Sequence, residues 1–219
     1  MLRVIERLDE GVWTWRARHP EWHPGKWGAE VVSFAIGEQG RTLLVDPLVP
    51  DDLWEELDGV VAGKVEILTT NPYHVRSAAE ASARYGGANV WGHPACAKRL
   101  KDRSVFCELR TDRTPAGVSA YTIGKPRRHE MPLRIASQRA LVFGDAVVGT
   151  PEGLRVWEQI KGGDERRERW YAERFLPTLE PLALLDIERV LVTHGPSVIH
   201  GGRRALRDAL AQPPWYHHG

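Results

Sequence analysis

The chain has 219 residues, of which 42% are hydrophobic and 27% are charged, as in ordinary soluble globular domains. Its formal net charge of +1 gives no reason to expect binding to nucleic acid or to a membrane. The charged N-terminus lacks the apolar core of a signal peptide, and no run approaches the roughly 20 apolar residues of a membrane span. We therefore expect a cytoplasmic protein with a single domain over residues 1–219. The sequence carries no indication of its oligomeric state.

The first half of the chain alternates strand patterns with helix patterns. Its predicted elements are strands over 12–16, 30–36 and 42–46, a helix over 51–59, a strand over 65–69, a helix over 77–85, a strand over 89–91 and a short helix over 94–100. The strands follow from alternating or continuous apolar residues. The helices follow from acidic or serine residues at their starts and from glycines at their ends.

The second half repeats this order of elements after a linker over 110–118. Its predicted elements are strands over 119–123, 133–136 and 140–144, a helical stretch over 166–185, a strand over 189–193, a helix over 203–211 and a loose tail over 213–219. The two related halves, roughly 1–115 and 116–212, predict packed sheets that are covered by helices.

Polar residues follow three of the buried strands. Asp145 follows the strand over 140–144, His194 follows the strand over 189–193, and Asn71 and His74 follow the strand over 65–69. Strand ends that converge at one edge of a sheet are where open α/β folds build their sites. The sequence therefore predicts a site at this edge, with His74, Asp145 and His194 as its candidate catalytic residues.

Five segments, in this order, resemble the metallo-β-lactamase fold superfamily over roughly residues 30–205. They are TLLVDPL, ILTTNPYHVRSAAE, RRHEMP, LVFGDAVVG and LVTHGPSV. The resemblance implies an α/β fold, an αββα four-layer sandwich of two packed mixed sheets flanked by helices. It also implies a site for one or two zinc, iron or manganese ions that activate water for hydrolysis.

The HxHxDH metal motif of that superfamily is degenerate here. Its two histidines fall on Asn71 and Tyr73, its aspartate on Val75 and its last histidine on Arg76. A branch of bacterial proteins resembles this chain in carrying the same degenerate motif. By the resemblance, His129, Asp145 and His194 match the remaining ligand positions, whereas His74 lies one place out of register.

Two functional hypotheses follow, and the sequence favours the first. In the first, no metal binds, Arg76 pairs with Asp145, and the protein is a pseudoenzyme that binds a small polar or anionic molecule or a partner. Asn71, Tyr73, Arg76 and His129 would line its pocket. A third option is metal-free catalysis, with His74 or His194 as the base and Tyr73 as the acid.

In the alternative hypothesis, one zinc, manganese or iron ion is held by His129, Asp145 and His194, with His74 as a further ligand if it reaches the site. The protein would then hydrolyse a small ester, thioester or lactone. Under either hypothesis, the tryptophan-rich loop that contains Trp22 and His23 is a candidate wall of the pocket.

Overall fold

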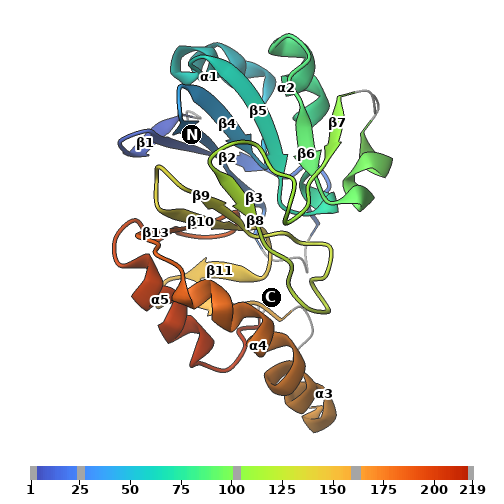
Figure 1. The fold of residues 1–219 in the computed structure, drawn as a ribbon, viewed down its shortest axis with the longest axis vertical. Helices are drawn as coiled ribbons and strands as arrows, with labels where there is room; N and C mark the ends of the chain where they lie inside the picture. The colour runs from blue at the N-terminus through green and yellow to red at the C-terminus, as the bar shows by residue number, and fades with distance from the viewer. Residues whose placement is uncertain (1–3, 24–27, 101–104, 159–163, 217–219) are drawn as a thin grey trace.

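Two β-sheets lie face to face in a computed structural model of the chain, which describes residues 4–23, 28–100, 105–158 and 164–216. Figure 1 shows the sheets as the two inner layers, with helices on the outer face of each. The predicted αββα sandwich is therefore confirmed. Within the described part, none of the helices has the length and apolar character that crossing a membrane requires.

The first sheet has seven strands in chain order, and they come from residues 6–108. They are β1 (Glu6–Asp9), β2 (Val12–Arg18), β3 (Glu30–Glu38), β4 (Arg41–Val45), β5 (Lys64–Thr69), β6 (Val90–Gly92) and β7 (Phe106–Glu108). The first four strands pair antiparallel, and β4 to β7 pair parallel. Two strands, β1 and β7, are not predicted, because each is short and neither has a buried apolar pattern.

The second sheet has the strand order β13-β10-β9-β8, and a separate hairpin of β11 and β12 stands beside it. The strands are β8 (Val118–Ala120), β9 (Leu133–Ile135), β10 (Ala140–Phe143), β11 (Val147–Thr150), β12 (Gly153–Val156) and β13 (Arg189–Val192). β10 and β13 are parallel, and the other pairs are antiparallel. The β11–β12 hairpin is not predicted, because each strand has four residues and each contains a glycine.

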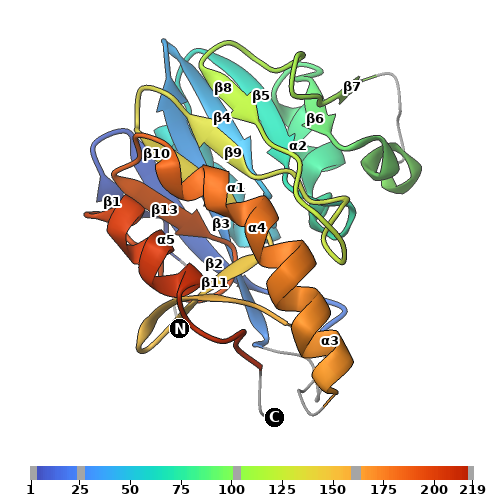
Figure 2. The same cartoon turned by 60° about the horizontal axis from the view of Figure 1, so that its bottom comes forward.

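The α-helices pack on the outer faces of the two sheets. They are α1 (Trp54–Val60), α2 (Ala78–Arg84), α3 (Glu165–Trp170), α4 (Leu176–Leu179) and α5 (Gly202–Leu210). The 3₁₀ helices are η1 (Asp51–Leu53), η2 (Pro72–His74), η3 (Pro94–Arg99) and η5 (Glu180–Leu184), and η4 (Tyr171–Phe175) is a π-helix. Figure 2 shows α3, α4 and α5 on the side of the second sheet.

The helical stretch predicted over 166–185 is broken into four short helices. Pro177 lies in the first turn of α4 and Pro181 in the first turn of η5. Proline lacks the backbone N–H that continues an α-helix, so the helix type changes at each of these residues.

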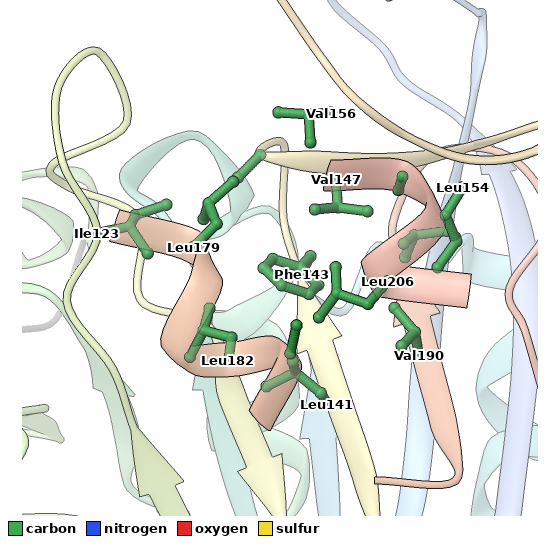
Figure 3. Packing of buried hydrophobic residues seen from close by; sticks show 14 of the residues in the cluster. Ile123, Leu141, Phe143, Val147, Leu154, Val156, Leu179, Leu182, Val190 and Leu206 are labelled. Atoms are coloured by element: carbon green, nitrogen blue, oxygen red, sulfur yellow. The ribbon is translucent and has the colours of Figure 1, made fainter. Parts of the chain in front are cut away.

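The buried apolar residues form three layers, one between the two sheets and one between each sheet and its helices. In β10, Leu141 and Phe143 face the helices, whereas Ala140 and Val142 face the first sheet. Figure 3 shows Leu141 and Phe143 beside Leu182 and Leu206 of the helical layer. Successive side chains of a strand point to opposite faces, so a strand that is covered on both faces, such as β10, is apolar at every position.

The tail predicted to be loose is in part ordered against the hairpin. The Trp215 N–H donates to the Val156 carbonyl at 2.8 Å, and the Glu158 N–H donates to the Trp215 carbonyl at 3.0 Å. The prediction is wrong for these residues, because a short backbone ladder needs no apolar pattern. Residues 217–219 of the predicted tail lie outside the described part.

Candidate functional site

Polar residues gather where parallel strands of the two sheets end. Asp46 follows β4, Asn71 follows β5, Asp145 follows β10 and His194 follows β13. β4 pairs parallel to β5, and β10 pairs parallel to β13, so the members of each pair end together. Asn71 Nδ2 lies 3.3 Å from Asp145 Oδ2, and His194 Nε2 lies 3.2 Å from Asp145 Oδ1. The strand ends therefore meet at one edge, as the sequence predicts.

His74 reaches this edge because a 3₁₀ turn follows β5. Asn71 caps the turn, since its side-chain oxygen accepts a hydrogen bond from the Tyr73 N–H at 2.9 Å. Pro72 occupies the first turn, where its missing N–H costs nothing. The tight turn points His74 inward and leaves the Tyr73 side chain exposed. This is why a residue one place out of register with the superfamily motif joins the site.

Asp46 is a fully buried carboxylate that fixes the His74 ring. Its Oδ1 accepts from the Thr70 N–H at 2.7 Å, and its Oδ2 accepts from the Thr70 hydroxyl at 2.5 Å. The same Oδ2 lies 2.8 Å from His74 Nδ1. With Nδ1–H donating to Asp46, the lone pair of His74 Nε2 is available to a ligand or a metal.

Asp145 lies between two imidazole rings. Its Oδ1 is 3.3 Å from His74 Nε2 and 3.2 Å from His194 Nε2, and the three ligand atoms all lie within 4.8 Å of one another. Asp145 and His194 are mostly buried, with side-chain exposures of 15% and 13%. Figure 1 shows the parallel strands β10 and β13, which carry these two residues at their ends.

Two of the three separations in this cluster, those that involve Asp145, fit a tetrahedral metal ion. Zinc binds histidine nitrogen and carboxylate oxygen at about 2.0–2.2 Å, so neighbouring tetrahedral ligands are separated by about 3.4 Å. The two nitrogen–oxygen distances, 3.3 and 3.2 Å, are close to that separation. The same distances also suit a protonated imidazole beside a carboxylate. His74, Asp145 and His194 are thus the residues that could hold a metal.

The other oxygen of Asp145 is held by neutral and charged donors. Asn71 Nδ2 and Arg127 Nη1 each lie 3.3 Å from Asp145 Oδ2. The guanidinium carbon of Arg127 also stands 4.5 Å from the centre of the Trp157 ring, a cation–π contact. Sequence reasoning missed Arg127, because its loop between β8 and β9 has no periodic pattern.

Arg76 does not form the predicted ion pair with Asp145, although both residues lie in the described part. Its Nη1 donates instead to the Asp46 carbonyl at 2.9 Å and to the Val32 carbonyl at 3.4 Å. Arg76 has a φ of +42°, and this left-handed backbone directs its side chain toward the end of β4. The prediction is wrong because Arg127, from a different loop, provides the cation beside Asp145.

Glu130 is a second residue that the sequence did not reveal. Its buried carboxylate accepts from the backbone N–H groups of Gly144, Asp145 and Ala146 at 2.9–3.1 Å. Burial and the nearby Asp145 raise the pKa of Glu130 to about 7, although Arg127 and the backbone donors oppose the shift. Glu130 thereby fixes the main chain that carries Asp145.

The remaining predicted residues lie apart from the cluster or at its margins. His129 is exposed, and its ring lies 4.8 Å from that of His93, outside the group of His74, Asp145 and His194. Trp22 lies under the Arg18 guanidinium at 5.2 Å, and His23 is exposed. Residues 24–27 of the same loop lie outside the described part.

The pKa values of the two histidines in the cluster are shifted in opposite directions. Burial and the charge of Arg76 lower the pKa of His74, but Asp46 and Asp145 outweigh them and raise it. Burial lowers the pKa of His194 further than Asp145 can raise it. Although burial opposes ionisation, the two histidines hold the pKa of Asp145 well below its usual range. The lowered pKa of His194 favours its neutral imidazole, the form that binds metals, whereas the raised pKa of His74 favours its protonated form, which has to lose a proton before it can bind one.

A groove with a volume of about 460 Å³ lies beside the loop that follows His194. Gly195, Pro196 and Ser197 form one wall, and side chains of β1, β2 and β3, including Arg16 and Arg18, form the other. His74 and Asp145 do not line it. The groove therefore borders the site without containing it.

Solved structures with similar folds cover nearly the whole chain. DIM-1 metallo-β-lactamase exposed to ceftazidime has a TM-score of 0.65 and 12% identity over 95% of this chain and 96% of its own. FIM-1 from Pseudomonas aeruginosa in its mono-zinc form has a TM-score of 0.61 and 14% identity over 97% and 94%. The chemotaxis sensor ODP with a peroxy diiron species has a TM-score of 0.62 and 13% identity over 96% and 96%. At these identities, the likeness concerns the fold.

Sequence comparison adds little to this result. No family model matches the chain. The dual-specificity RNA pseudouridine synthase RluA of Escherichia coli (strain K12) is 30% identical over 109 residues, which are 49% of each chain. This chain therefore spans about half the length of the curated relatives that it matches.

Proposed function

Because the chain has the metallo-β-lactamase fold, we propose that it is a hydrolase that uses one metal ion, held by His74, Asp145 and His194. The observation that carries the proposal is that Asp145 Oδ1 lies 3.3 Å from His74 Nε2 and 3.2 Å from His194 Nε2, separations that suit neighbouring ligands of a tetrahedral ion. The three protein ligands would leave a fourth position open, as in catalytic zinc sites. When bound, such an ion polarises the scissile group and activates water.

The residues around the ligands have separate roles in this proposal. Asp46 fixes the tautomer of His74, so that Nε2 faces Asp145. Asn71 and Arg127 orient Asp145 by holding its Oδ2, which leaves Oδ1 toward the two histidines. Glu130 holds the backbone of Asp145 in place. Ligands that Asp46, Asn71 and Glu130 already hold in place lower the cost of binding the ion.

The substrate we propose is a small ester, thioester or lactone with a polar or anionic group. Tyr73 is 69% exposed immediately before His74, and the Arg99 guanidinium lies 4.3 Å from its ring. This pair places a cation next to the turn that carries His74. An anionic group of the substrate would be attracted to it.

A second candidate function, metal-free binding of a small anion or partner, is favoured by the charges of the site. Arg127 lies beside Asp145, and Arg76 binds the backbone of Asp46. Two guanidinium groups therefore accompany two buried carboxylates, a balance that needs no metal. The two candidates differ in whether purified protein takes up metal.

Elemental analysis after dialysis against zinc, manganese or iron(II) separates the two candidates. We expect about one metal ion per chain, lost in Asp145→Ala and in His194→Ala, because three protein ligands are about the minimum for a catalytic site. The matched control is His129→Ala, which removes an exposed histidine outside the cluster and should keep the metal. Protein that takes up no metal would support the metal-free candidate. Loss of metal in His129→Ala would contradict the ligand set.

Hydrolysis would then be tested with the metal-loaded protein on generic esters, thioesters and lactones. Activity should appear with the metal, disappear with a chelator, and be absent in His194→Ala. Activity that survives both chelation and the removal of metal from the protein would favour metal-free catalysis by a histidine base.

A further inference from the structure

The Arg127 guanidinium is held against Asp145 in a mostly enclosed position. Its side chain is 13% exposed, Nη1 lies 3.3 Å from Asp145 Oδ2, and the Trp157 ring lies 4.5 Å from its central carbon. Nε and Nη2 are buried and have no hydrogen-bond partner among the described residues. Arginine keeps its proton at any ordinary pH, so a fixed positive charge stands in the site.

The two oxygens of Asp145 are divided between two kinds of partner. Oδ2 receives Arg127 and Asn71, and Oδ1 faces His74 and His194. A carboxylate can bridge two metal ions through its two oxygens, and here one of these oxygens already contacts a cation. Known proteins of this fold include a mono-zinc form and a diiron form, so the number of ions differs among them.

We propose that Arg127 is an internal cation that competes with the metal ion for Asp145, which weakens metal binding and restricts the site to one ion. This inference rests on the proposed metal site. A guanidinium and a divalent ion that share one carboxylate repel each other, and burial limits the screening of that repulsion by salt. The arrangement also keeps Asp145 ionised and in place when the metal leaves. The metal would therefore bind reversibly to a site that is already assembled.

Three variants separate the charge of Arg127 from its packing. Arg127→Met keeps a long side chain against Trp157 and removes the charge, and Arg127→Lys keeps the charge. Arg128→Met removes a charge from the adjacent exposed residue and is the matched control. The affinity for Zn²⁺ would be measured by competition with a chromophoric chelator, and the absorption spectrum with Co²⁺ would report the coordination geometry. Thermal unfolding of the metal-free proteins would verify that each variant folds.

We expect Arg127→Met to bind Zn²⁺ at least about tenfold more tightly than the unchanged protein, because a nearby charge in a buried site costs more than tenfold in affinity. Arg127→Lys and Arg128→Met should bind like the unchanged protein, with one ion per chain at saturation. If Arg127→Met does not fold, Arg127→Gln carries the same test.

A decrease in the Zn²⁺ affinity of Arg127→Met, in place of the expected increase, would overturn the inference. If Arg127 only holds Asp145 in position, both Arg127→Met and Arg127→Lys should bind Zn²⁺ more weakly or equally. Binding by Arg127→Met but not by the unchanged protein would uphold the inference and overturn the proposed function of the natural chain. Absence of binding in every variant would overturn both, whereas equal binding in all of them would overturn the role of Arg127 alone.

Discussion

His74 Nδ1 lies 2.8 Å from Oδ2 of Asp46, and this contact decides which nitrogen of the ring faces Asp145. Because Asp46 is fully buried and also receives both donors of Thr70, it cannot turn away from the ring. Asp46, which lies outside the cluster of possible ligands, thereby sets the orientation of His74 within it.

Replacing Asp46 by asparagine should weaken metal binding by about 10- to 100-fold, as the loss of an outer partner of a ligating histidine commonly does. The asparagine amide retains the size of the side chain but loses the charge that orients Nδ1–H. Isothermal titration with Zn²⁺ measures the change. Asp186→Asn, at an exposed ion pair with Arg139, is the control and should bind like the unchanged protein. Unaltered affinity in Asp46→Asn would mean that the ring needs no such support.

Glu130→Ala should lower the free energy of unfolding by about 3 kcal/mol or more, because each buried donor left without an acceptor costs about 1–3 kcal/mol. Three backbone N–H groups, those of residues 144–146, lose their acceptor in this variant. Urea titration of the metal-free protein measures the loss. Glu173→Ala, at an exposed position, should change stability little. Similar stabilities of the two variants would show that water replaces the carboxylate.

Gly195→Ala and Gly40→Ala form a matched pair that separates backbone strain from lack of space. Their φ angles are +78° and +75°, so alanine is strained at both, by about 1–2 kcal/mol. A Cβ at Gly195 would also lie 1.9 Å from the Gly149 carbonyl oxygen, whereas a Cβ at Gly40 meets no atom within 4 Å. We expect Gly195→Ala to be the less stable variant and to lose metal affinity, because His194 precedes it. Thermal unfolding and zinc titration test both points. Equal losses of stability in the two variants would mean that the loop at Gly195 moves to make room for the added Cβ.

Glu66 should contribute to the pH dependence of the free energy of unfolding. Burial raises the pKa of Glu66, but hydrogen bonds from Lys64 and Trp91 outweigh it and lower the pKa below the ordinary 4.5. The folded state therefore favours the ionised form, and this stabilisation is present above pH 4.5 and is lost as the pH falls through the lowered pKa. Glu66→Gln should be less stable at pH 7 by about 1–2 kcal/mol and should lose less stability on acidification. Urea unfolding at pH 7 and at lower pH values tests this prediction. If the unfolding free energies of Glu66→Gln and the unchanged protein fall equally with pH, the prediction is contradicted.

The sequence predicted the inner strands and the two residues that end β10 and β13. Asp145 and His194 each follow an apolar run and lie next to a glycine, so pattern alone places them at a strand end. The role of His74 depends on a single 3₁₀ turn, which has no period to read. Arg127 and Glu130 lie in an irregular loop, and their partners are 14 to 18 residues away along the chain. Such contacts follow from the packing of loops and not from local patterns.

The backbone ladder between Trp215 and the β12 strand has a consequence for the order of folding. Trp157, which follows β12, lies 4.5 Å from the Arg127 guanidinium and 6.1 Å from the His194 ring. Trp157 pairs in a parallel β-bridge with Trp215, which lies far from it in the sequence. Contacts between residues far apart in sequence form late, and during synthesis the N-terminal parts of a chain fold first. The first sheet, which uses residues 6–108, can thus assemble early with Asp46 and His74 in place, whereas the contacts of Trp157 with Arg127 and His194 depend on segments that are synthesised later.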